Sequence, residues 1–139
     1  SKTFFSRKTK ELDKIVVPSF PAMNQLLNYR IALATNLATA SGRYDCKEIA
    51  WFHEILVAGK TFVDFEDSGL PRFLSLDVKL GVQLIPTILA NSEVIILYDD
   101  ILLKQREAVE NGKVLKARQI VWLILDYYKC IANLELVYT

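Results

Sequence analysis

The sequence has few of the residues on which metal and redox sites depend. Its 139 residues include one histidine, two cysteines and one methionine. The cysteines, Cys46 and Cys130, lie far apart in the chain, and their spacing fits no zinc or redox motif. Each lies among apolar residues, where a free cysteine usually behaves as a small buried hydrophobic group. We therefore expect two buried, reduced thiols that are not bonded to each other, in an intracellular protein.

Glycine is also scarce, and the patterns of several enzyme classes are incomplete. The five glycines are isolated from one another, which excludes a glycine-rich phosphate-binding loop. His53 and Glu54 begin a zinc-protease motif, but Val57 stands where the second histidine is needed. The acidic residues at 64–67 lack the ligand order and closing glutamate of a calcium loop. We predict a protein that is not an enzyme, with no catalytic, cofactor-binding or metal-binding residues.

Neither sign of charge is in excess, and no long hydrophobic run is present. The chain has seventeen basic and sixteen acidic residues, so its net charge does not attract it to nucleic acid or to an acidic membrane. The uncharged run Leu80–Ser92 is too short to cross a membrane and contains Pro86. Apolar residues make up 52% of the chain and charged residues 24%, which excludes intrinsic disorder. We predict one globular domain without a membrane span.

The first fourteen residues depart from this even distribution of charge. They hold five basic residues against two acidic ones. A basic arm of this kind can contact RNA or a neighbouring subunit, but the interpretation we favour is a solvated, lysine-rich end. We accordingly divide the chain into a basic N-terminal arm, residues 1–14, and a single helical domain, residues 15–139. The candidate contact residues of the arm are Lys2, Arg7, Lys8 and Lys10.

The remaining sequence is dominated by apolar residues at helical spacing. Two prolines in Ile15–Pro21 predict an extended strap. Apolar spacing, capping residues and glycines then predict five main helices. Their expected bounds are residues 22–41, 45–59, 75–86, 91–111 and 114–133, followed by a short strand or a disordered tail over residues 134–139. The predicted fold is all-α, a single helical bundle with the N-terminal proline-containing strap packed against it.

The last predicted helix is apolar around most of its circumference. Such a helix is either the central pillar of the bundle or an interface. A helix at the edge of a small bundle buries one side only, and interfaces are enriched in aromatic residues. We therefore take Trp122, Tyr127 and Tyr128 as the candidate interface. The alternative is that these three side chains belong to the core.

Seven segments, taken in order, resemble those of a known family. They are Val17–Pro21, Asn36–Arg43, Glu48–Phe52, Thr61–Gly69, Phe73–Leu80, Lys104–Ala108 and Gly112–Ile120. The set resembles the Gag-like N-terminal part of Copia-type LTR retrotransposon polyproteins, in particular those of dinoflagellate genomes. The resemblance implies an all-helical capsid-type subunit that assembles into shells around RNA. We cannot place the Gln-Gly…Glu…Arg segment of retroviral-type capsids, and the zinc knuckle that follows many of them is missing.

Two functions from different classes are consistent with this sequence. The first is a self-associating structural protein of capsid type, which forms a homo-oligomer. The alternative is a small helical adaptor or accessory subunit that docks on a larger protein complex through the same apolar surface. Because the chain starts at Ser1, we also expect it to be processed or cut from a longer polypeptide.

Overall fold

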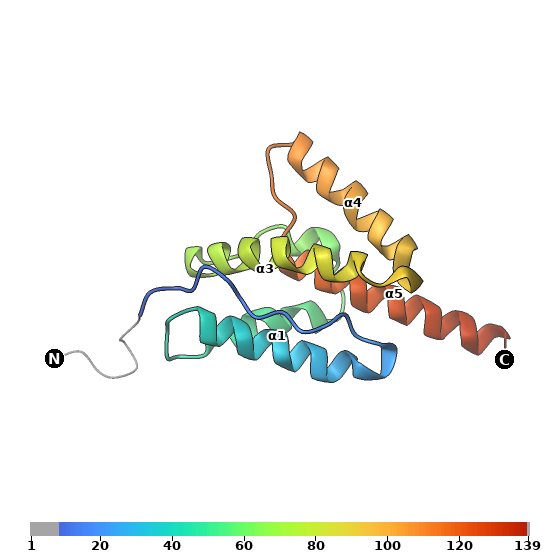
Figure 1. Ribbon diagram of the computed structural model, residues 1–139, viewed down its shortest axis with the longest axis horizontal. Coiled ribbons are helices and arrows are strands. Elements are labelled where there is room, and N and C mark those ends of the chain that lie inside the picture. Colours follow the sequence, from blue (N-terminus) through green and yellow to red (C-terminus); the bar gives the residue numbers. More distant parts are fainter. Residues whose placement is uncertain (1–8, 139) are drawn as a thin grey trace.

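The structure is a computed structural model that describes residues 9–138, with side chains described up to residue 136. Five α-helices and no strand are present over residues 9–138, so the predicted all-α fold is confirmed (Figure 1). The helices are α1 (Leu26–Ala40), α2 (Lys47–Phe52), α3 (Pro71–Leu89), α4 (Ile95–Glu110) and α5 (Ala117–Tyr138). Short 3-10 turns lie between them: η2 (Met23–Gln25), η3 (His53–Leu56), η4 (Phe62–Phe65) and η5 (Ser92–Val94).

Helix α5 is the central pillar of the fold. It packs against α3, α4, η3 and η4, and Ile120, Val121 and Ile124 on it are fully buried. The prediction that it ends near residue 133 was wrong, because the helix continues to Tyr138. No glycine or proline interrupts residues 134–138, so nothing in the sequence stops the helix there. In Figure 1 its C-terminal half projects beyond the other helices.

The strap crosses the bundle in extended form, as predicted, between α1 and α3 (Figure 1). Ile15 inserts into the core with 2% of its surface exposed. Its backbone N–H donates to Oε1 of Gln83 at 3.0 Å, and Nε2 of Gln83 donates back to the Ile15 carbonyl. On the other side, Nδ2 of Asn36 donates to the Val16 carbonyl at 2.8 Å. The strap thus joins α1 to α3, because side-chain amides on both helices form hydrogen bonds with its backbone.

Helix α3 is longer than the sequence predicts at both ends. It begins at Pro71, a residue whose fixed φ suits the first helical position. At the other end it continues past Pro86 to Leu89. Proline removes one backbone donor but leaves its carbonyl free, and the N–H of Ala90 donates to the Pro86 carbonyl at 3.2 Å. Burial of Ile88 in the core stabilises this added turn.

Two further expectations are corrected around α2. The single helix predicted over residues 45–59 is a short α2 followed by η3. Cys46, which precedes α2 in a left-handed conformation with φ 56°, is exposed. Cys130 is exposed as well, because it lies on α5 past the last buried residue, Ile124. Both thiols are free, but neither is the buried hydrophobic group that the sequence predicts.

Candidate interaction surface

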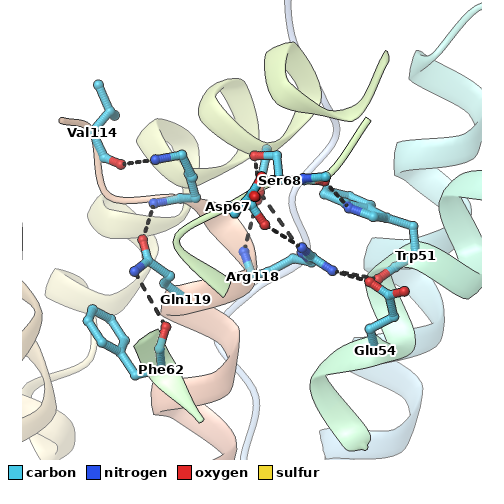
Figure 2. Close-up of polar contacts among 11 residues, drawn as sticks. Trp51, Glu54, Phe62, Asp67, Ser68, Val114, Arg118 and Gln119 are labelled. Carbon is cyan, nitrogen blue, oxygen red and sulfur yellow. Dashed lines mark hydrogen bonds and ion pairs between the residues drawn. The ribbon is translucent and has the colours of Figure 1, made fainter. Parts of the chain in front are cut away.

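A buried polar cluster surrounds Arg118, in the first turn of α5 (Figure 2). The Arg118 side chain donates to the carbonyl of Trp51 at 3.1 Å and to Oε1 of Glu54 at 2.6 Å. It also donates to the Asp67 carbonyl at 3.0 Å. Its guanidinium lies over the Trp51 ring, 4.6 Å from the centroid. One arginine thereby connects α2, η3, α5 and the turn before α3.

Asp77 of α3 completes this cluster from the opposite side. Its Oδ1 accepts from the Arg118 backbone N–H at 3.0 Å, and its Oδ2 accepts from the Ser68 hydroxyl at 2.8 Å. Burial raises the pKa of Asp77, while these two hydrogen bonds and the Arg118 charge act in the opposite direction. The carboxyl group occupies the N-terminal end of α5, where a backbone donor needs a partner. We interpret the cluster as a structural joint between α3 and α5.

A second cluster fastens α2 to α3. Arg72 donates to both carboxylate oxygens of Asp45 at 2.7 Å and to Oε2 of the fully buried Glu48 at 2.6 Å. These hydrogen bonds hold the pKa of Asp45 well below its usual range. Within residues 9–138, no group of three or more His, Cys, Asp or Glu side chains is placed to hold a metal ion. The charged side chains of both clusters are engaged with one another and with backbone groups of the same chain.

The three predicted interface residues of α5 are half-buried against the core, and they contact different parts of the chain. The Tyr128 hydroxyl donates to the Pro21 carbonyl at 2.7 Å, and its ring lies 6.2 Å from that of Phe20. Tyr128 therefore holds the strap. Tyr127 packs edge-on against it, with 5.4 Å between ring centroids. Trp122 lines a groove beside the loop that follows η3, and the role of the three residues as an interface remains a prediction.

The predicted basic arm is described only from Thr9 onward. Lys10 is exposed, whereas Lys2, Arg7 and Lys8 lie outside the described residues. The Thr9 N–H donates to the Gly42 carbonyl at 2.6 Å, beyond the end of α1. Glu11 accepts from Ser75 and pairs with Lys79 on α3. Residues 9–14 are thus attached to the helical body.

Helix α4 exposes an apolar face. Only Leu97 and Ile101 of this helix are buried, and α4 stands at an angle to α3 and α5 so that one side alone meets them (Figure 1). Ile96 is 76% exposed and Val109 is 63% exposed. The large apolar side chains that α4 exposes are Ile95, Ile96, Leu102, Leu103 and Val109.

These side chains form two rows along the outer face of α4. Residues seven apart lie nearly above one another on a helix. Ile95, Leu102 and Val109 make one row, and Ile96 and Leu103 make the other. Between the rows lie Asp99 and Arg106, also seven apart, and both are exposed. Over residues 9–138 neither has an ion-pair partner. We call these seven residues the outer α4 face.

Comparison with known proteins provides no relative. No family model, no curated protein and no solved structure matches this chain. Along residues 9–138 no single helix is long and apolar enough to cross a membrane. Helices α3 and α4 reach the required length and composition only when taken together, and the chain bends by 104° between them. The similarity to Gag of Copia-type elements therefore rests on the sequence segments alone.

Proposed function

We propose that this protein is a non-enzymatic structural subunit that self-associates, comparable to the capsid domain of a retrotransposon Gag polyprotein. The observation that supports this proposal is the outer α4 face, with its two rows of exposed apolar side chains. Monomeric soluble proteins rarely expose large contiguous apolar patches, and such patches commonly mark interaction sites. Covering this face removes apolar surface from water, at about 25 cal/mol per Å².

The buried clusters support an assembly role for a second reason. Arg118, Asp77 and Arg72 fix α2, α3 and α5 to one another through charge-assisted hydrogen bonds. Helix α4 is joined to this rigid body at both ends and packs on it through Leu97 and Ile101. A surface that is held in place loses little conformational freedom when it binds. The fold therefore presents the outer α4 face in a form ready for association.

The test is the mass of the purified full chain measured by sedimentation velocity over a wide range of concentration. We expect the mean mass to rise above that of one chain as concentration increases. A monomer at every concentration would contradict self-association. That result would favour the alternative function, a helical adaptor that uses the same face to dock on a larger protein complex.

A further inference from the structure

We propose that the outer α4 face binds the same face of a second copy, with the two α4 helices antiparallel about a two-fold axis. The axis passes between Leu102 and Leu103. This inference rests on the proposed self-association and gives it a surface, an orientation and a register.

Charge on the outer α4 face selects the orientation. Asp99 and Arg106 lie at equal distances in sequence from the midpoint between Leu102 and Leu103. An antiparallel pair centred there places each Asp99 opposite Arg106 of the other copy, and the symmetry makes this contact twice. A parallel pair would instead place Asp99 opposite Asp99 and Arg106 opposite Arg106. Like charges in such positions oppose association, so the charges favour the antiparallel pair.

The apolar rows obey the same symmetry. A two-fold axis that lies in the contact plane keeps each row on its own side of the pair. Leu102 then meets Leu102 of the second copy, and Leu103 meets Leu103. Ile95 lies opposite Val109 of the second copy, which covers both ends of that row. Apolar residues therefore flank the two Asp99–Arg106 contacts and exclude water from them, which strengthens a charge pair relative to one in solvent.

The size of the face indicates a weak, closed dimer. A helix of 16 residues is about 24 Å long. One such helix face is smaller than the surface of about 800 Å² per partner found in stable interfaces. We therefore expect a reversible dimer with a dissociation constant in the micromolar range. Since a two-fold contact closes on itself, assemblies larger than a dimer require a further surface.

The experiment is a charge exchange in the full chain, followed by sedimentation equilibrium. Asp99→Arg and Arg106→Asp each create two like-charge contacts across the proposed axis. We expect each single variant to weaken dimerisation by at least about tenfold. The double variant Asp99→Arg/Arg106→Asp restores opposite charges, and we expect its dissociation constant to return to within about threefold of wild type. Circular dichroism of each variant checks that the helical fold is intact.

Lys129→Asp supplies the matched control. Lys129 is exposed on α5 and lines the groove beside Trp122, away from the outer α4 face. We expect this charge reversal to leave dimerisation unchanged. If wild type associates and the single α4 variants associate equally well, the α4 pairing is wrong while self-association stands. If the single variants weaken association and the double variant does not restore it, the antiparallel register is wrong. A wild-type monomer at every concentration would overturn both proposals.

Discussion

Helices α4 and α5 are both rich in large apolar residues, but the fold uses them in opposite ways. Ile124 on α5 is fully buried, whereas Ile96 on α4 is 76% exposed. The first turns of α5 also contribute Arg118 to a buried polar joint. On α4, Asp99 and Arg106 are exposed and have no ion-pair partner among the residues that the structure describes. The difference shows that apolar content alone does not separate a buried helix from a helix with an exposed apolar face. Which side of each helix the rest of the chain covers decides its role.

Loss of Arg118 is expected to have the largest effect on stability. Arg118→Ala leaves the carbonyls of Trp51 and Asp67 without this donor and removes the positive charge beside the buried Asp77 carboxyl. Removing one member of a buried charge cluster typically costs about 3–5 kcal/mol of unfolding free energy. Urea unfolding followed by circular dichroism measures this loss. Arg106→Ala, an exposed arginine on α4, is the matched control. Below the concentration of self-association it should change the unfolding free energy by less than about 0.5 kcal/mol. Equal effects of the two variants would show that the Arg118 cluster does not hold the core.

The same substitution on the two helices separates core from surface. Ile124→Ala creates a cavity in the core and should cost about 2–5 kcal/mol of unfolding free energy. Ile96→Ala should change that free energy by less than about 0.5 kcal/mol. Urea unfolding at a concentration below that of self-association keeps the dimer from contributing. A large loss for Ile96→Ala would place α4 in the core and remove the contrast between the helices.

Gly81 tests how closely α5 and its preceding segment approach α3. A Cβ at this position would lie 2.9 Å from the backbone carbonyl oxygen of Leu115, so the backbone would have to shift to accept it. Gly81→Ala should therefore destabilise the fold by about 1–3 kcal/mol through overpacking. In an exposed helix the same change stabilises by roughly 1 kcal/mol. A shift in that stabilising direction, measured by thermal unfolding, would contradict the close contact.

The smallest expected effect is a pH dependence at the joint between α2 and α3. Arg72 lowers the pKa of Asp45 in the folded state, so the folded chain binds that proton less readily than the unfolded chain. The resulting stabilisation is present above the unfolded value of about 3.9 and is lost as pH falls through the folded value. In a plot of unfolding free energy against pH, Asp45→Asn should reduce the slope at acidic pH. An unchanged slope would show that the ion pair with Arg72 does not contribute in solution.

Much of this fold follows from local sequence signals. Asn91 accepts from the Glu93 N–H at the predicted start of its helix, and Gly42 and Gly112 adopt positive φ at predicted helix ends. These features depend on a few neighbouring residues. The continuation of α3 through Pro86 was not predicted, because it depends on burial of Ile88 by the rest of the chain.

The polar joints were missed for a different reason. Arg118 looks like one member of a solvated basic cluster near the last helix turn, and only the folded chain brings Asp77 and Glu54 to it. One signal was available, since Asp77 lies four residues after Phe73 and three before Leu80, in the buried row of α3. The heptad rows of α4 were visible as well. Which of its faces meets the core depends on the angle between α4 and α3, which no local pattern encodes.

We infer that the outer α4 face is a self-association surface. Sedimentation equilibrium of Leu103→Glu tests it most directly, because Leu103 is exposed and lies beside the proposed two-fold axis. Two glutamates would then face each other across the pair. We expect this variant to fold and to stay monomeric at concentrations where wild type dimerises. Dimerisation of Leu103→Glu with wild-type affinity would contradict it.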